Sequence, residues 1–107
     1  MPRKIINLTE RTADILAKMG KRIKNARLRR DISIKSISEQ ASVSEGTLYA
    51  IEKGSDSVSI GAYAAVLSVL GLDNDFDLVA KDEEDKKKFW EHNVRRRERA
   101  TGKSKFL

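Results

Sequence analysis

Hydrophobic residues recur at helical spacing through most of the first 80 positions of this chain. The first series follows Thr9, a favourable N-cap residue, and predicts a helix that runs to about Arg30. Its apolar members are Ile15, Leu16, Met19, Ile23, Ala26 and Leu28. Alternation of period two never extends beyond a few residues, so the pattern predicts an all-α fold.

Four shorter helices are expected after the first one. The N-cap candidates of the first three are Ser33, Ser44 and Ser59, and Asp73 opens the fifth helix. Gly54 and Gly71 suit the ends of the third and fourth helices. The residues expected to face inward are Ile34, Ile37 and Ala41 in the second helix, Thr47, Leu48 and Ile51 in the third, and Ile60, Tyr63, Val66, Leu67 and Leu70 in the fourth. The fifth helix, which is expected to end at Ala80, carries Phe76, Leu78 and Val79.

The most informative stretch is residues 33–54, SIKSISEQASVSEGTLYAIEKG. One short amphipathic run ends at Ala41, the tight break Ser42–Ser44 follows, and a second run stops at Gly54. Two short helices joined by such a turn form a helix-turn-helix, whose second helix fits the major groove of DNA. We therefore expect a sequence-specific DNA-binding domain.

Charged residues divide the chain into three parts. Residues 1–32 carry ten Lys or Arg against three Asp or Glu, residues 33–80 carry two against seven, and residues 81–107 carry ten against six. A basic excess suits phosphate binding, which supplies most non-specific affinity for nucleic acid, although a solvated charged surface is an alternative. Because the part that contains the expected DNA-reading helix is acidic, affinity for DNA would have to come from its neighbours.

The composition shifts after residue 80, so we expect one domain at residues 9–80 and a charged extension at 81–107 that is either helical or disordered. Cysteine is absent, and no apolar run approaches the ~18 residues of a membrane span. The N-terminus lacks the apolar segment of a signal peptide, so a cytoplasmic protein is expected. Since the sequence has no Gly-rich phosphate loop and His92 is its only histidine, we expect no enzyme activity, no metal and no cofactor.

Several motifs together resemble the Cro/cI-type (Xre-like) helix-turn-helix domain of phage and bacterial repressors. They cover about residues 20–72 and consist of Arg22, Arg27, the two helices of residues 33–54, the run Ile51-Glu52-Lys53-Gly54, and residues 66–72, VLSVLGL. The resemblance implies a five-helix DNA-binding domain. One position departs from the family, which often has Gln as a phosphate contact at the start of the second helix. Ile34 stands there in this chain, and Lys35 is the candidate substitute.

A narrower likeness is to HipB-like antitoxins, which are encoded beside HipA-type kinase toxins. It depends on residues 59–67, SIGAYAAVL, on residues 70–73, LGLD, and on the Arg-rich tail up to about Arg99. This likeness implies autorepression of a toxin–antitoxin operon and binding of a HipA-type kinase toxin.

The family pattern places the base-reading residues on the outer face of the third helix, at Ser44, Glu45, Gly46, Tyr49 and Ala50. Glu45 can accept a hydrogen bond from cytosine N4, but it equally suits a helix N-terminus for electrostatic reasons. Tyr49 can donate to phosphate or pack its ring on a thymine methyl group. Gly46 has no side chain, so the backbone there can approach the bases closely.

The candidates for phosphate contacts are Arg22, Arg27, Lys35, Thr47 and Lys53. For Thr47 the alternative is packing in the turn, and for Lys53 it is interaction with the helix dipole. The resemblance implies that Arg27 and Glu52 pair across the domain. Glu52 is therefore expected to be structural, and Arg27 to combine a structural role with a phosphate contact.

A homodimer on an inverted-repeat DNA operator is expected, since one small domain contacts few bases. Its interface is assigned to the fifth helix, with Phe76 and Leu78. Three roles are open for the basic cluster of the tail, which can be a DNA arm, a toxin-binding surface or a solvated end. Its residues are Arg95, Arg96, Arg97 and Arg99. Trp90 can anchor an interface or dock back on the first helix.

The expected function is therefore a sequence-specific transcriptional repressor that serves as the antitoxin of a kinase toxin. One alternative is a stand-alone Xre-like repressor with no toxin partner. Another is an antitoxin scaffold that binds its partner without reading DNA.

Overall fold

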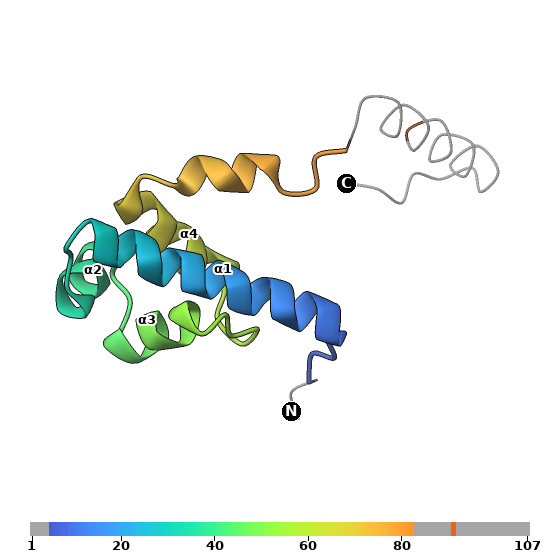
Figure 1. Ribbon diagram of the computed structural model, residues 1–107, viewed down its shortest axis with the longest axis horizontal. Coiled ribbons are helices and arrows are strands. Elements are labelled where there is room, and N and C mark those ends of the chain that lie inside the picture. The colour runs from blue at the N-terminus through green and yellow to red at the C-terminus, as the bar shows by residue number, and fades with distance from the viewer. Residues whose placement is uncertain (1–4, 83–90, 92–107) are drawn as a thin grey trace. The chain divides into compact units, whose positions relative to one another are not determined.

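The computed structural model describes residues 5–82 and residue 91. The elements in this part of the chain are α1 (Glu10–Arg29), α2 (Ile34–Ala41), α3 (Glu45–Glu52), α4 (Ile60–Leu70) and the 3-10 helix η1 (Asp73–Leu78) (Figure 1). The described residues contain no β-strand, which confirms the predicted all-α fold with five helices. None of these helices combines the length and the apolar character needed to cross a membrane.

The chain divides into two compact units, residues 1–76 and 77–107, and helices α1 to α4 belong to the first unit. The domain limits expected from the sequence, 9–80 and 81–107, stay a prediction. The residues of the tail for which a role is predicted lie outside the described part of the chain: Trp90, Arg95, Arg96, Arg97 and Arg99.

Each of the four α-helices begins at a hydroxyl side chain that bonds the backbone of its first turn. The four caps are Thr9, Ser33, Ser44 and Ser59, and each accepts a hydrogen bond from the amide three residues later at 3.0 to 3.1 Å. A cap of this kind stabilises a helix by about 1 kcal/mol, because it satisfies an amide that has no partner within the helix. The four predicted starts are confirmed.

Glycines end two of the helices, as predicted. Gly54 follows the last turn of α3 with a φ of 75°, and Gly71 ends α4 with a φ of 76°. The amide of Gly54 donates to the Ile51 carbonyl oxygen at 2.9 Å, and the amide of Leu72 donates to that of Leu67 at 2.8 Å. Since glycine adopts a positive φ without steric penalty, the chain leaves both helices sharply.

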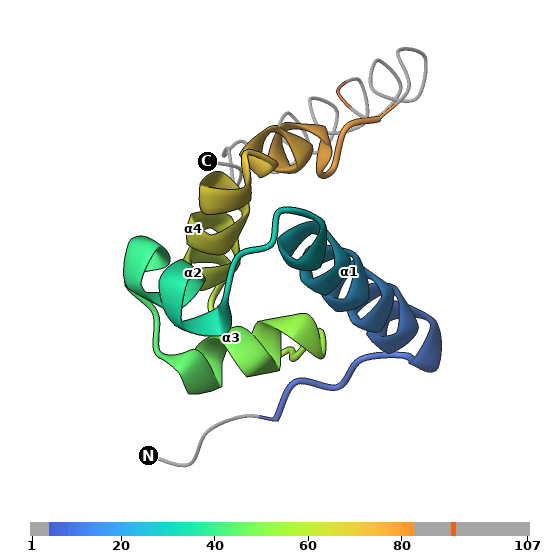
Figure 2. The ribbon, with the colours of Figure 1, turned by 60° about the vertical axis from the view of Figure 1, so that its left-hand side comes forward.

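The core lies between the four α-helices, with α1 on one side, α2 and α4 on the other and α3 across the base (Figure 2). Its buried apolar residues are Ile23, Ala26, Ile37, Leu48, Ile51, Tyr63, Val66, Leu67 and Leu70. Removal of this apolar surface from water is the main stabilising contribution in a small domain. The Tyr63 hydroxyl, at the edge of the core, donates to the Ser55 carbonyl oxygen at 2.6 Å.

Some apolar residues lie outside this core. The predicted burial of Ile60 is wrong: its side chain is 72% exposed, because it is the first residue of α4 and the helix reaches the core only at Tyr63. Ile15 is half-exposed because it lies in the N-terminal part of α1, where no residue before Gly20 is buried. Leu28 is also half-exposed, since it lies off the inward face of α1.

The fifth helix is shorter than predicted and of a different type. It is a 3-10 helix that ends at Leu78 instead of Ala80, and none of its residues is fully buried. Ala80 has a φ of 63°, a left-handed conformation through which a right-handed helix does not continue.

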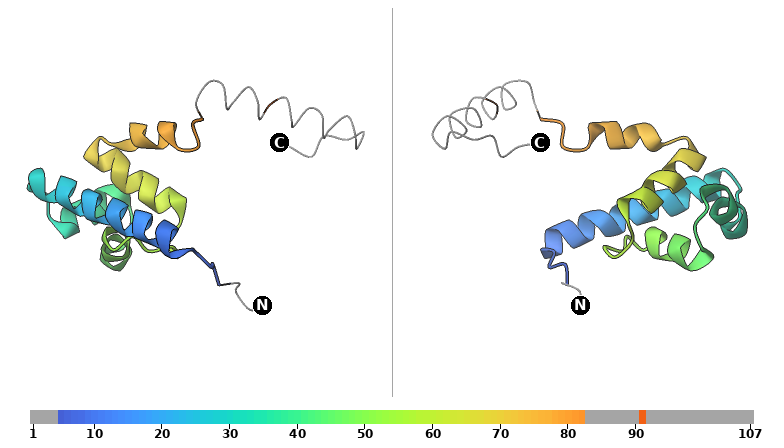
Figure 3. Two further views of the ribbon diagram at one scale, coloured as in Figure 1. Left: turned by 45° about the vertical axis from the view of Figure 1, so that its right-hand side comes forward. Right: turned by 180° about the vertical axis from the view of Figure 1, so that it is seen from behind.

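Helices α1 and α3 pack with their backbones in close contact. A Cβ atom at Gly20 would lie 2.5 Å from the Gly54 amide nitrogen and 2.6 Å from the Ile51 carbonyl oxygen, closer than real side chains approach. A Cβ atom at Gly54 would likewise overlap the backbone of Leu16. Both views in Figure 3 show α3 (green) below α1 (blue). The two glycines therefore set how near the two helices lie.

Candidate nucleic-acid interface

A three-residue turn joins α2 to α3. Ser42 has a left-handed conformation, with φ 57° and ψ 40°, and the Val43 amide donates to the Ser38 carbonyl oxygen at 3.0 Å. Val43 packs against the core, which anchors the turn from inside. The buried Ser38 hydroxyl donates to the Ile34 carbonyl oxygen at 2.9 Å, and no buried side-chain nitrogen or oxygen atom in the described part of the chain lacks a hydrogen bond. These contacts hold α3 firmly against the rest of the domain.

Helix α3 presents two different faces. Leu48 and Ile51 are fully buried, which directs the opposite face of the helix outward. All the predicted base-reading residues lie on or next to that outer face: Ser44, Glu45, Gly46, Tyr49 and Ala50. They are exposed, except for the half-buried Ala50, and Tyr49 keeps 55% of its surface accessible. The structure thus brings the five residues together on one accessible surface.

An ion pair between Arg27 and Glu52 joins the inner side of α3 to α1. Arg27 Nε donates to Glu52 Oε2 at 2.7 Å, and Nη2 donates to Oε1 at 3.2 Å. Arg27 Nη1 donates to the Ile32 carbonyl oxygen at 3.1 Å. The side chains of Arg27 and Glu52 are 10% and 6% exposed. Each charge is therefore shielded from water and depends on the other for stabilisation.

This geometry bears on the two roles that the sequence predicts for Arg27, a structural role and a phosphate contact. The hydrogen bond that Arg27 donates to Glu52 raises the pKa of Arg27, against the opposing effect of burial, so the guanidinium group stays charged. All three of its nitrogens donate hydrogen bonds within the domain. Little of the side chain is left for a DNA phosphate. The structural role is to hold α1 against α3, and the phosphate contact stays a prediction.

The other basic candidates for phosphate contacts lie on three helices. Lys35 on α2 and Lys53 at the end of α3 are exposed. Arg22 is also exposed, but it lies about 200° around α1 from Gly20, which faces α3. The structure therefore places Arg22 on the flank of α1 that turns away from α3, and it does not bring Arg22 to the other candidates.

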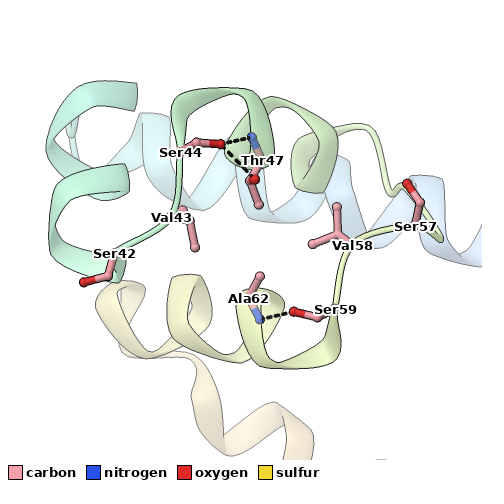
Figure 4. Close-up of a pocket in the computed structure, with 8 residues that line it drawn as sticks. All are labelled: Ser42, Val43, Ser44, Thr47, Ser57, Val58, Ser59 and Ala62. Carbon is pink, nitrogen blue, oxygen red and sulfur yellow. Dashed lines mark hydrogen bonds between the residues drawn. The ribbon is translucent and has the colours of Figure 1, made fainter.

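A hollow of about 440 Å³ opens between the first turns of α3 and α4 (Figure 4). It is lined by Ser42, Val43, Ser44, Thr47, Ser57, Val58, Ser59 and Ala62. Ser44 Oγ donates to Thr47 Oγ1 at 2.9 Å, so the predicted phosphate ligand Thr47 lies at the edge of the hollow with its hydroxyl held in place. The first turns of two helices border the hollow, where the amides of Thr47 and Ala62 donate to the capping hydroxyls of Ser44 and Ser59.

Three features of this surface were missed from the sequence. The close approach at Gly20 had a signal, because an isolated glycine inside a long helical pattern often marks a tight contact. The left-handed conformation of Ser42 had none, since glycine or asparagine is the usual residue there. The Ile32 carbonyl that binds Arg27 is a backbone group, which no side-chain pattern reveals.

The two residues predicted for a dimer interface differ in exposure. Phe76 is half-buried and packs against the core of its own unit. Leu78 is 62% exposed. Phe76 therefore has a role within its own core, and the dimer interface stays a prediction.

A family model described as a helix-turn-helix domain matches residues 18–77, which is more than half of the chain. No curated protein matches the chain. The matched residues include the turn between α2 and α3, the outer face of α3 and the Arg27–Glu52 pair. The chain therefore belongs to the helix-turn-helix family, and it is a DNA-binding transcription regulator of the Xre/Cro type.

Proposed function

We propose that this regulator is a repressor that reads an inverted-repeat DNA operator as a homodimer. The outer face of α3 carries the proposal, because it is accessible while Leu48 and Ile51 fix the helix in the core. A firmly held helix with a free polar face suits the major groove.

Glu45 and Tyr49 are the principal base-reading side chains in this proposal. The Glu45 carboxylate accepts a hydrogen bond from a base amino group, such as cytosine N4, and the Tyr49 ring packs on an apolar base edge. Ser44 and Ala50 flank these two residues, and Gly46 lets the backbone come close. An operator that these residues recognise has amino donors opposite Glu45.

Affinity comes mainly from groups around α3, since the charged residues of α3 itself, Glu45 and Glu52, are both acidic. Lys35 and Lys53 contact phosphates beside the groove. Thr47 and the amide groups at the hollow between α3 and α4 suit a further phosphate, because helix starts favour anions. Arg22, which turns away from α3, contributes through long-range attraction.

Two copies related by a two-fold axis place their α3 helices about one helical turn of DNA apart, or a multiple of it. The exposure of Leu78 and Val79, at 62% and 64%, supports an interface near the end of η1, together with Phe76. Sedimentation of wild type and Leu78→Asp tests this part, with a loss of dimer expected for the variant. A monomeric wild type at operator-binding concentrations would contradict it.

We further propose that the repressor is a cytoplasmic antitoxin that controls its own operon and binds a HipA-type kinase toxin. The likeness of residues 59–73 and of the Arg-rich tail to HipB-like antitoxins supports this. A stand-alone repressor and a scaffold that binds a partner without reading DNA are the competing functions. Membership of the helix-turn-helix family favours a regulator over an enzyme.

Competition binding tests the reading of DNA. The wild-type protein is mixed with a labelled duplex of its own upstream region and a random competitor at about physiological salt. Specific complexes exceed non-specific ones by about 10³-fold or more, so a competitor-resistant shift is expected, and Tyr49→Ala and Glu45→Ala should abolish it. Glu39→Ala is the charge-matched control, since it removes an exposed carboxylate from α2. Equal binding to both duplexes would leave only the scaffold function.

The antitoxin proposal is tested with the product of the neighbouring gene. A kinase-like protein that co-purifies with this chain, and whose toxicity the chain suppresses, is the expected result. A neighbour of another kind would leave a stand-alone repressor.

A further inference from the structure

Gly46, on the outer face of α3, meets no structural requirement of its own domain. A Cβ atom built there contacts only Ser44 Oγ, at the ordinary distance of 3.8 Å. The positive φ angles among the described glycines belong to Gly54 and Gly71, so Gly46 has no need of glycine's conformational freedom. Alanine is more stable than glycine inside a helix. Folding alone therefore favours Ala at position 46.

The neighbours of Gly46 show what the missing side chain leaves free. Tyr49 and Ala50 follow Gly46 by three and four residues and so lie on the same face of α3. The exposed Tyr49 ring stands beside a stretch of helix that has no side chain at position 46 and only a methyl group at position 50. Glu45 adds a carboxylate at the N-terminal side. The surface at Gly46 is thus little crowded, with the Tyr49 ring and the Ala50 methyl group on one side and the Ser44 hydroxyl and the Glu45 carboxylate on the other.

We propose that Gly46 is a specificity-determining residue that admits the 5-methyl group of one thymine in each operator half-site against the α3 backbone. The inference rests on the proposed function, in which α3 enters the major groove. The thymine methyl is the apolar group that base pairs present in that groove, and the Tyr49 ring and Ala50 methyl supply apolar contacts for it. Since Glu45 needs an amino donor, the thymine should neighbour a cytosine or an adenine. A Cβ atom at position 46 would occupy the space of the methyl group.

A combined substitution of protein and DNA tests this inference. Each thymine of the operator is replaced in turn by deoxyuridine, which removes the methyl group alone, and the affinities of wild type and Gly46→Ala are measured. For wild type, deoxyuridine at one thymine per half-site should lower the affinity about fourfold, which is the contribution of burying one methyl group. Gly46→Ala should bind the unmodified operator about tenfold or more weakly. At that same thymine, deoxyuridine should restore binding by the variant.

Gly61→Ala is the matched control. Gly61 is also the second residue of its helix, α4, and a Cβ atom there meets only Ser59 Oγ, at 3.9 Å. Both alanine variants should melt at a higher temperature than wild type, which shows that both are folded. Only Gly46→Ala should change the response to deoxyuridine.

The outcomes separate this inference from the proposed function. The inference would be overturned if Gly46→Ala bound the operator as tightly as wild type does. It would also be overturned if Gly46→Ala bound more weakly and deoxyuridine relieved this loss of affinity at no position. In both cases, operator binding by the wild type would still stand. A wild type that does not prefer its operator would overturn both.

Discussion

The junction between α1 and α3 and the outer face of α3 are two sides of one helix with opposite physical requirements. At the junction, Gly20 and Gly54 bring two backbones together, and the Arg27–Glu52 pair is almost shielded from water. On the outer face, Glu45 is exposed, and a Cβ atom at Gly46 would meet only Ser44 Oγ, at the ordinary distance of 3.8 Å. Helix α3 therefore has one side fixed by packing and one side free of packing constraints, and the second is the side to which we assign DNA recognition.

The largest effect on stability is expected at the buried ion pair between Arg27 and Glu52. Arg27→Met leaves the Glu52 carboxylate buried without its partner, which should lower the free energy of unfolding by about 3–5 kcal/mol. Chemical denaturation measures the loss. The exposed pair Lys18–Asp14, with an N–O distance of 3.2 Å, is the contrast, and Lys18→Met should change stability by less than about 1 kcal/mol.

A double variant sharpens this test. Arg27→Met combined with Glu52→Leu removes both charges, so it should recover much of the stability lost by Arg27→Met alone. A loss of the same size for Lys18→Met and Arg27→Met would contradict the special role of the junction.

The next largest effect on stability is expected at Gly20, where the backbone of α1 lies against residues 51–54. Gly20→Ala puts a methyl group 2.5–2.7 Å from backbone atoms of Ile51, Glu52 and Gly54, so it should destabilise the domain by about 1–3 kcal/mol. Gly61→Ala, where a Cβ atom meets only Ser59 Oγ at 3.9 Å, should stabilise it by about 0.5–1 kcal/mol. Opposite signs in thermal unfolding are the expected result, and a gain of stability at Gly20 would show that α1 and α3 can move apart freely.

A smaller effect is expected at the turn that leads from α2 into α3. Ser42 has a φ of 57°, where glycine is favoured over residues with a Cβ atom. Ser42→Gly should stabilise the domain by roughly 0.5–1 kcal/mol, as the relief of strain exceeds the added flexibility of the unfolded chain. Thermal unfolding of the variant at neutral pH measures the gain. A loss of stability would instead assign the Ser42 side chain a packing role.

The smallest effect is a pH dependence at the edge of the core. Burial, and then the charge of Asp56, raise the pKa of Tyr63 above its ordinary value of 10.0. A raised pKa in the folded state means that the neutral phenol is favoured by folding. This stability is fully present below the unfolded pKa of about 10, and it is lost as pH rises through the higher folded pKa.

Wild type and Tyr63→Phe should therefore differ in their melting temperatures above about pH 10. Wild type should lose more stability than Tyr63→Phe as the pH rises above about 10, because only wild type has a phenol at this position. Lysine deprotonation affects both proteins equally, so it does not contribute to the difference. Parallel curves for the two proteins would remove Tyr63 as the cause. The Arg27–Glu52 pair should persist through this range, since the pKa of Arg27 is raised by its hydrogen bond to Glu52.

The site was predictable where its residues follow from the helical period. If Leu48 and Ile51 face the core, the helical period directs Gly46 and Tyr49 outward. The structure has Leu48 and Ile51 buried and Gly46 and Tyr49 exposed. Arg22 shows the limit of this reasoning. It can be recognised as a basic residue on α1, but its orientation relative to α3 depends on which face of α1 packs there, and Gly20 decides that.

Signals local to the sequence set where α1 to α4 begin and where α3 and α4 end, but not the type or the end of η1. Ser33, Ser44 and Ser59 bond amides three residues away, and Gly54 and Gly71 act through their own φ angles, so these signals need no distant partner. Only the tertiary structure decided that Gly20 touches α3, that Arg27 is buried and that Ile60 is exposed. Those outcomes depend on how far apart the helices lie and which faces meet, and contacts between residues distant in sequence set both.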